Sequence, residues 1–248
     1  MSVEDSVVAH LSNHFAHVIK PMSDPTLSQL FIGQLANLPG DGTPTGMYKH
    51  PVAEAWADLN GLRGDVQADR RFHGGPDKAV HHYPAEHYPR LAAQAPAAAQ
   101  ALCAGSLGEN LSTTGWDEHN VCIGDCYQVG DALLQVTQPR KPCWKINARF
   151  DVEGLSVFVA EQGLTGWYCA VRRPGRLWPG ALLRRVSRPA ETLSLADFTR
   201  LQAEHRPDPA RLLAAASIDG LAADLAQRLR ERAAWLQQLA VQRRTPAR

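Results

Sequence analysis

The chain has 248 residues, of which 44% are hydrophobic and 21% are charged, a composition typical of a globular protein with one sizeable core and room for a small second module. Its formal net charge of +1 is too small for the basic field that nonspecific nucleic-acid binding requires, so no nucleic-acid partner is expected. No run of about 18 apolar residues exists, and Met1–Lys20 carries Glu4, Asp5 and three histidines where a signal peptide would be apolar, which predicts a cytoplasmic protein without a membrane segment.

The first 26 residues end in a cluster of proline and serine, and they are interpreted as an N-terminal extension, either a peripheral helix or a mobile arm. The main fold is predicted to follow, over residues 27–187.

Short apolar runs separated by glycine, proline, aspartate and asparagine predict β-strands between Leu30 and Val136. These runs are Leu30–Leu35, Gly46–Val52, Val121–Val129 and Ala132–Val136. The pair Gly130-Asp131 tolerates positive φ angles, which favours a hairpin between the last two runs. Many short strands joined by turns are typical of a barrel.

Two parts of the chain are predicted to be helical. His82–Leu91 and the alanine-rich stretch to Leu102 are interpreted as one or two helices within the barrel region. From Leu193 the pattern changes: Thr192 or Ser194 is placed to cap a first helix, and two further helical runs follow. The last run, Leu221–Leu239, is amphipathic. Residues 188–248 are therefore predicted to form a separate small helical domain.

Two glycine-containing segments suit ligand binding. In Gly64–Val80 the pair Gly74-Gly75 frees backbone N–H groups, and the cations of the segment suit an anion: Arg70, Arg71, His73 and Lys78. In Gly105–Gly115, Glu109 and Asn110 lie between glycines. A polar surface turn beside a helix start explains the first segment, and a plain turn flanking a strand explains the second, equally well.

Five cysteines, an odd number, indicate reduced thiols rather than a disulfide framework. Cys143 is flanked by Arg140, Lys141 and Lys145, whose charges favour the thiolate that binds metals or attacks electrophiles. A lone cysteine is more often a small buried hydrophobic residue, so composition alone leaves both interpretations open. Cys122 and Cys126 lack a second pair at zinc-site spacing and are interpreted as structural thiols.

Four segments, in this order, closely resemble the MOSC domain of YiiM-like proteins: Asp69–Ala79, His82–Tyr88, Gly108–Ser112 and Gln138–Asn147. The resemblance covers about Leu30 to Ser187, and the tail from Leu193 resembles the three-helix "3-alpha" domain that follows MOSC in that branch. It implies a mainly β fold with α-helices, in which a MOSC-type β-barrel carries helical decorations and a small C-terminal three-helix domain follows.

The resemblance also implies a cofactor, the molybdenum cofactor (Mo-molybdopterin). Cys143 corresponds to the cysteine that binds molybdenum in the family, and a thiolate suits this thiophilic metal. Cations and N–H groups then hold the cofactor's phosphate. The candidates for this are Arg71, His73, Gly74, Gly75, Lys78 and Arg140, with Asn110, Lys145 and Asn147 as weaker candidates.

The activity that the resemblance implies is an oxidoreductase reaction, the reduction of N-hydroxylated compounds to amines, especially N-hydroxylated purine bases such as 6-N-hydroxylaminopurine. His73 or His82 is the candidate proton donor, because imidazole titrates near neutrality, although either histidine also suits a structural hydrogen bond. The chain carries neither a flavin fingerprint nor an iron–sulfur cysteine set, so a separate reductase is expected to supply electrons.

Alternative functions stay open at this point. MOSC domains also occur at the end of molybdenum-cofactor sulfurases, so Cys143 could instead carry a persulfide. A noncatalytic cofactor-binding module is a third interpretation. A zinc site of His81, His82 and His87 is disfavoured, because adjacent histidines on a helix diverge. The sequence does not decide the oligomeric state.

Overall fold

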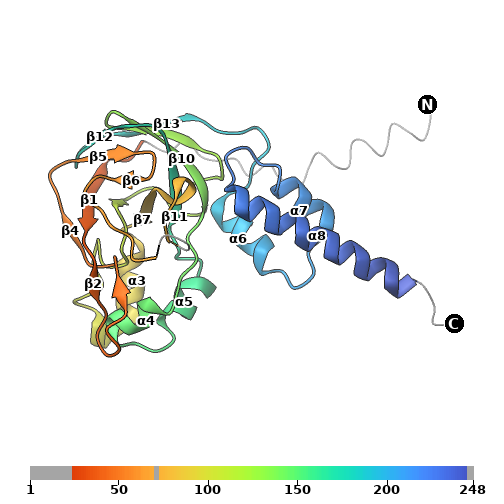
Figure 1. Cartoon of the computed structure of the whole chain (residues 1–248), viewed down its shortest axis with the longest axis horizontal. Helices are drawn as coiled ribbons and strands as arrows, with labels where there is room; N and C mark the ends of the chain where they lie inside the picture. Colours follow the sequence, from red (N-terminus) through yellow and green to blue (C-terminus); the bar gives the residue numbers. More distant parts are fainter. Residues whose placement is uncertain (1–23, 70–72, 245–248) are drawn as a thin grey trace.

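The computed structural model describes residues 24–69 and 73–244 and shows a strand-rich body with three helices at its C-terminal end (Figure 1). The strands are β1 Leu27–Gly33, β2 Ala36–Asn37, β3 Pro44–Thr45, β4 Lys49–Pro51, β5 Ala55–Asp58, β6 Gly61–Leu62, β7 Val80–Pro84, β8 Leu111–Thr113, β9 Cys126–Val129, β10 Ala132–Pro139, β11 Trp167–Arg173, β12 Gly175–Leu177 and β13 Leu183–Ser187. The helices are α3 His87–Gln94, α4 Lys145–Phe150, α5 Leu155–Glu161, α6 Leu195–Ala203, α7 Pro209–Ala215 and α8 Ala223–Arg244, and η1 Pro76–Lys78 and η2 Pro96–Ala98 are 3₁₀ turns.

Eight strands form one curled sheet in the order β13-β9-β10-β11-β7-β8-β1-β4. All neighbours are antiparallel except β7 and β8, which are parallel. The curl returns the start of β1 to the start of β13, where Thr26 bridges to Leu182 and the N–H of Leu183 donates to Pro25 O over 2.7 Å. This half-barrel with helices confirms the predicted mainly β fold class. Residues 24–26 take part in it, and the rest of the predicted extension lies outside the described residues.

The predicted hairpin is confirmed. Ala132 pairs with Val129, so Gly130 and Asp131 form the two-residue turn between β9 and β10. Gly130 has φ 54°, in the left-handed region that glycine adopts without cost from a Cβ atom.

The helix predicted from His82 is wrong at its beginning. Residues Val80–Pro84 form strand β7, and the helix begins only at His87. All five residues of β7 are buried, because β7 lies between β11 and β8 and both of its faces are covered. Ladder pairing on both sides outweighs the local pattern, and Pro84 is tolerated because it ends the strand.

Two hydrophobic clusters hold the fold. The larger fills the half-barrel around Tyr127 and Trp167 and continues without interruption into Phe198, Leu212 and Leu229 of the C-terminal helices. The smaller lies under α3, α4 and α5, and Tyr83 of β7 joins it from the sheet. The C-terminal helices therefore share the core of the barrel.

The C-terminal helices follow their sequence signals closely. Ser194 caps α6, because its Oγ accepts from the N–H of Asp197 over 3.0 Å, and Asp208 caps α7 in the same way through Ala210. The amphipathic run predicted from Leu221 forms α8, which in Figure 1 runs from the barrel outward toward the C-terminus. No helix among the described residues is long and apolar enough to cross a membrane.

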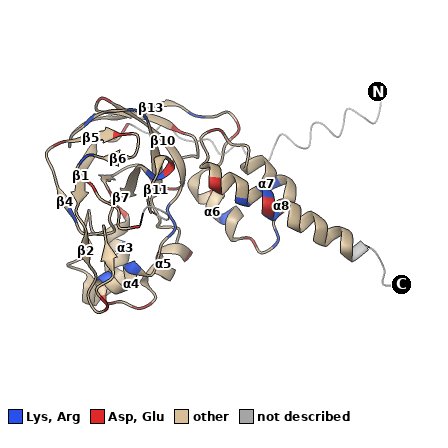
Figure 2. Ribbon diagram, in the orientation of Figure 1, with Lys and Arg blue, Asp and Glu red and all other residues tan. Residues whose placement is uncertain are grey.

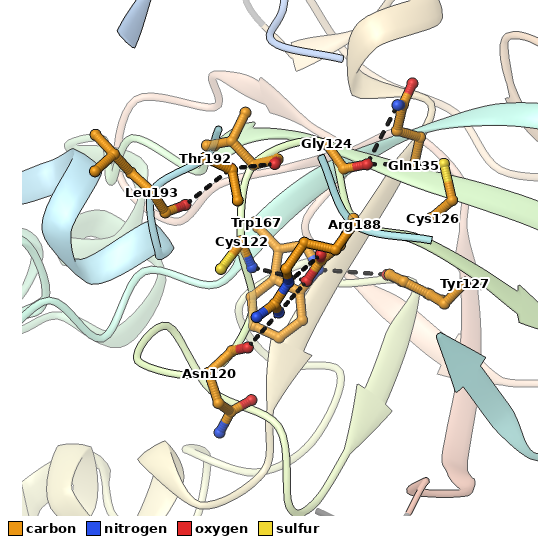
Figure 3. A network of polar contacts seen from close by, with 12 residues as sticks. Asn120, Cys122, Gly124, Cys126, Tyr127, Gln135, Trp167, Arg188, Thr192 and Leu193 are labelled. Carbon is orange, nitrogen blue, oxygen red and sulfur yellow. Dashed lines mark hydrogen bonds and ion pairs between the residues drawn. The ribbon is translucent and has the colours of Figure 1, made fainter. Parts of the chain in front are cut away.

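A polar network joins the barrel to these helices (Figure 3). Asp125, in the turn before β9, is buried, and Arg188, directly after β13, donates to both of its carboxylate oxygens over 2.6 Å. Arg188 also donates to Asn120 O over 2.8 Å, and Thr192 donates to Ile123 O over 2.6 Å. These bonds fix the path of the chain between the last strand and α6.

Candidate functional site

A pocket with about 570 Å³ of empty space, partly open to solvent, lies at one end of the half-barrel. The loops that follow β3, β6 and β10 and the loop that precedes β8 meet there with β4, β7, β11 and η1. The lining residues are Gly46, Met47, Lys49, Asp65, Val66, Gln67, Ala68, Asp69, His73, Lys78, His81, Leu107, Gly108, Asn110, Arg140, Cys143, Lys145 and Tyr168.

Six of the residues predicted from the sequence line this pocket together. They are His73, Lys78, Asn110, Arg140, Cys143 and Lys145. They come from three separate stretches of the sequence, and the curl of the sheet brings them to one place.

Other predicted residues do not line the pocket. Gly74 and Gly75 directly precede η1, and Gly75 has φ 93°. The two glycines therefore form the turn into η1. Asn147 lies inside α4, and its side chain accepts from the N–H of Ser156 over 2.7 Å, which holds α5 against α4. Arg71 lies outside the described residues.

His82 points away from the pocket. Its ring is fully buried in the barrel core, with Nδ1 3.0 Å from the Tyr127 hydroxyl and Nε2 2.6 Å from Thr113 Oγ1. Burial lowers the pKa of His82 to about 3. We therefore withdraw His82 as a proton donor, because its two ring nitrogens are occupied and it has no access to a ligand in the pocket.

His81, which was not among the site residues predicted from the sequence, lines the pocket in place of His82. Adjacent residues of a strand face opposite sides, so His81 lines the pocket while His82 enters the core. His81 is 5% exposed, and its Nε2 has no hydrogen-bond partner among the described residues. A strand prediction for Val80–Pro84 would have separated the two histidines.

Arg140 presents a second unsatisfied group. Arg140 is 4% exposed, its Nη2 donates to Leu107 O over 3.3 Å, and its Nη1 has no partner among the described residues. A buried cationic donor without an acceptor is costly. An oxygen-rich, negatively charged ligand in the pocket would satisfy it.

The pocket carries an excess of positive charge. Lys49, Lys78, Arg140 and Lys145 face two carboxylates, Asp65 and Asp69, which leaves two positive charges in excess among the described lining residues. Burial, with Arg140, Lys145 and Lys78 nearby, lowers the pKa of His73 to about 4, so His73 is neutral at physiological pH. Figure 2 shows blue segments on α4, the helix that contains Lys145 and Arg149.

A buried network supports the floor of the pocket. Asp65 accepts from Lys49 Nζ over 2.5 Å, from the N–H of Gly33 over 2.8 Å and from Asn110 Nδ2 over 3.0 Å. Asn110 in turn accepts from the N–H of His81 over 3.0 Å. Asn110 thus ties β7 to the loop before β7 and is a framework residue of the pocket wall.

Cys143 differs from the other cysteines in its surroundings. It is half-buried in the pocket, two residues before the start of α4, whereas Cys103 and Cys126 do not line the pocket. Cys122 and Cys169 are buried, and burial raises the pKa of their thiols to about 11 and about 12. Cys143 is therefore the thiol that a ligand in the pocket can reach.

Two other predicted features have structural explanations. Glu109 is fully buried and accepts from Tyr88 Oη, Gly105 N and Leu107 N over 2.5, 2.6 and 3.1 Å, so it closes its own turn. His87 Nε2 forms a hydrogen bond with Glu118 Oε2 over 2.7 Å. The described part of the chain holds no group of three or more His, Cys, Asp or Glu side chains suited to a metal ion.

Comparison with known proteins places this geometry in a family context. The MOSC domain profile matches residues 69–184. YiiM of Escherichia coli (strain K12) is 41% identical over 160 residues, which cover 64% of this chain and 71% of YiiM. YflK of Bacillus subtilis (strain 168) is 40% identical over 175 residues, which cover 69% of this chain and 78% of YflK.

Two further comparisons concern structure and activity. The crystal structure of E. coli YiiM matches with a TM-score of 0.71 and 31% identity, covering 87% of this chain and 94% of that structure. A protein of Gibberella moniliformis named "Reductase" is 37% identical over 147 residues, which are 59% of this chain and only 26% of the fungal protein.

Proposed function

The chain belongs to the MOSC-domain proteins of the YiiM type, and from that premise we propose that it is a molybdenum-cofactor-dependent reductase of N-hydroxylated compounds, with N-hydroxylated purine bases such as 6-N-hydroxylaminopurine as substrates. The observation that carries the proposal is the juxtaposition, in one pocket, of the accessible Cys143 thiol with the buried Arg140 guanidinium, whose Nη1 has no hydrogen-bond partner among the described residues.

The residues present fit a molybdenum cofactor. The Cys143 thiolate would hold the metal, because molybdenum prefers sulfur ligands. Arg140, Lys78 and Lys145 would hold the anionic phosphate of the pterin, and the excess of two positive charges matches a phosphate monoester dianion. When bound, the cofactor supplies the two-electron redox chemistry that none of these side chains can perform.

The side chains of the pocket then have defined tasks. Converting R–NH–OH to R–NH₂ and water consumes two electrons and two protons. His73, which is neutral above about pH 4, holds a proton on one ring nitrogen and can hydrogen-bond the leaving oxygen through it. Tyr168 stays a neutral phenol, because burial raises its pKa, and offers a second O–H group to the same space.

The electrons are proposed to come from a separate reductase. The fungal relative named "Reductase" matches this chain over only 26% of its own length, so most of that protein has no counterpart in the matched region. This supports a redox setting for the shared domain. We propose that the present chain receives electrons from a partner in trans.

The test is the molybdenum and pterin content of protein purified from a host that makes the cofactor. We expect about one molybdenum per chain in the wild type and a loss of at least tenfold in Cys143→Ala, since the thiolate is the metal's protein ligand. Cys103→Ala, which removes an exposed thiol outside the pocket, is the matched control and should keep its metal.

Activity on 6-N-hydroxylaminopurine with a supplied reductant should fall in parallel with the metal. Wild-type protein that contains neither molybdenum nor pterin contradicts the proposal. Intact mass then separates the alternatives, because a persulfide carrier shows one added sulfur on Cys143 and a binding module shows none.

A further inference from the structure

The start of α8 touches the segment that supplies Lys78 to the pocket. The N–H of Ala223, the first residue of α8, donates to the Asp77 side chain over 3.3 Å. Asp77 lies in η1, and the next residue, Lys78, lines the pocket. The residue that contacts α8 is therefore the immediate sequence neighbour of a residue that lines the pocket.

Strand β10 forms hydrogen bonds to both sides of this contact, through Thr137. Thr137 donates from Oγ1 to Asp77 O over 2.6 Å, and Thr137 O accepts from the N–H of Ala222 over 3.1 Å. The side chain of Thr137 is fully buried, and its Oγ1 also lies 3.0 Å from Tyr168 O, so the two carbonyl oxygens share its single O–H donor. Thr137 thus joins η1, β11 and the start of α8 at one point.

We propose that Asp77 is a positioning residue through which the C-terminal helices hold Lys78 at the pocket: the side chain of Asp77 is fixed by α8, its carbonyl is fixed by β10, and Lys78 is placed as a result. An unpaired N–H at the start of a helix attracts a carboxylate, so the contact favours both the helix and the bent η1 segment. The C-terminal unit then contributes to the electrostatics of the pocket without lining it.

The proposal rests on the proposed function only in taking this pocket as the anion site, and its test needs no cofactor. The probe is the reaction rate of Cys143 with a dianionic aromatic disulfide, dithiobisnitrobenzoate, divided by its rate with a neutral one, dithiodipyridine. A positive pocket accelerates the dianion selectively. Cys103→Ser and Cys126→Ser remove the other accessible thiols, and the raised pKa values of Cys122 and Cys169 keep those two thiols slow.

Two substitutions of Asp77 separate positioning from simple charge. The loss of the carboxylate charge near Lys78, taken alone, would raise the rate ratio equally in Asp77→Asn and Asp77→Ala, so a fall in the ratio reports a displaced Lys78. Asn keeps an oxygen that can accept from Ala223, whereas Ala keeps none. We expect Asp77→Ala to lower the ratio by about threefold or more, as Lys78→Met does, while Asp77→Asn stays at or above the wild-type value.

Asp224→Ala is the matched control, because it removes a carboxylate from the same turn of α8, where Asp224 accepts from Arg228 Nη1 over 3.0 Å. It should leave the ratio near the wild-type value. If Asp77→Ala does not fold, Thr137→Val, which removes the hydroxyl that holds Asp77 O, takes its place and should lower the ratio likewise.

A folded Asp77→Ala with a ratio equal to or above wild type overturns the proposal, as does an unchanged ratio in Lys78→Met. The proposed function fails separately. Wild-type protein without molybdenum would contradict the reductase proposal. The rate ratios would still measure whether Asp77 positions Lys78.

Discussion

Each ring nitrogen of His82 lies within hydrogen-bonding distance of a hydroxyl oxygen, and the indole of Trp167 packs 4.3 Å from the imidazole, centroid to centroid. The fully buried ring leaves no room for water to solvate a positive charge. Its neighbour His81 is equally buried, but its ring faces a cavity, and burial together with Arg140 holds its pKa well below the ordinary value. Both rings are therefore neutral. Of the two, His81 is the one placed to contact a ligand in the pocket.

The depressed pKa of His82 predicts a loss of stability in acid. The folded state binds the proton with a pKa of about 3 and the unfolded chain with about 6.5, so the stabilisation is complete above pH 6.5 and is lost as the pH falls toward 3. Between pH 7 and pH 4.5 the loss from this residue is roughly 2 to 3 kcal/mol.

Urea titrations across this range check the effect. His82→Gln removes the titrating group, so its free energy of unfolding should fall less steeply with acid, even though it is less stable at pH 7. An identical pH dependence in the two proteins would contradict the prediction.

At the scale of the element, the hairpin of β9 and β10 depends on Gly130. A Cβ atom at this position would lie 2.3 Å from Arg176 O and 2.8 Å from the Trp178 ring, and the φ of 54° strains an L side chain in addition. The turn carries the longest strand of the sheet, β10, which supplies Thr137 and leads into Arg140 and Cys143.

Gly130→Ala is therefore expected to destabilise the protein by about 2 to 4 kcal/mol, since overpacking against backbone adds to the strain of positive φ. Gly180→Ala is the matched control: φ there is 88°, but nothing lies within 4 Å of the added Cβ, so only the conformational cost of about 1 kcal/mol applies. Chemical unfolding midpoints measure both changes, and equal losses would mean that the clash with Arg176 O is relieved by a small shift.

At the scale of the whole molecule, the C-terminal helices share the core of the half-barrel. We retain the division into residues 1–26, 27–187 and 188–248 as a proposal about domain organisation, with one addition. The hydrophobic cluster passes through the boundary at residue 188, and the Asp125–Arg188 ion pair, with exposed fractions of 3% and 19% for the two side chains, lies directly on it.

This continuity predicts one cooperative unfolding transition for the two parts, with equal calorimetric and van't Hoff enthalpies. Arg188→Met leaves the Asp125 carboxylate buried without its partner and should cost about 3 to 5 kcal/mol, lowering the single melting temperature. Arg185→Met, on the exposed face of β13, is the matched control and should change stability by less than about 0.5 kcal/mol. Two separate transitions in the wild type would show that the helices fold independently.

The features that depend on local chemistry could be predicted from the residues. The turn at Gly130-Asp131, the cap at Ser194 and the amphipathic run that became α8 follow from residue types within a few positions of one another. The four family-like segments likewise singled out Arg140 and Cys143, because their order and composition are specific to the MOSC domain.

Which side chains lie together in the pocket depends on long-range packing. Whether Val80–Pro84 is a strand depends on β8 and β11, which lie about 30 and 90 residues further along the chain. That choice sends His81 into the pocket and His82 into the core. The contact between Asp77 and Ala223 joins residues 146 positions apart, and it exists only because the sheet curls and the C-terminal helices pack against it. Long-range packing of this kind leaves no periodicity in the local sequence, which is why it could not be predicted from the residues alone.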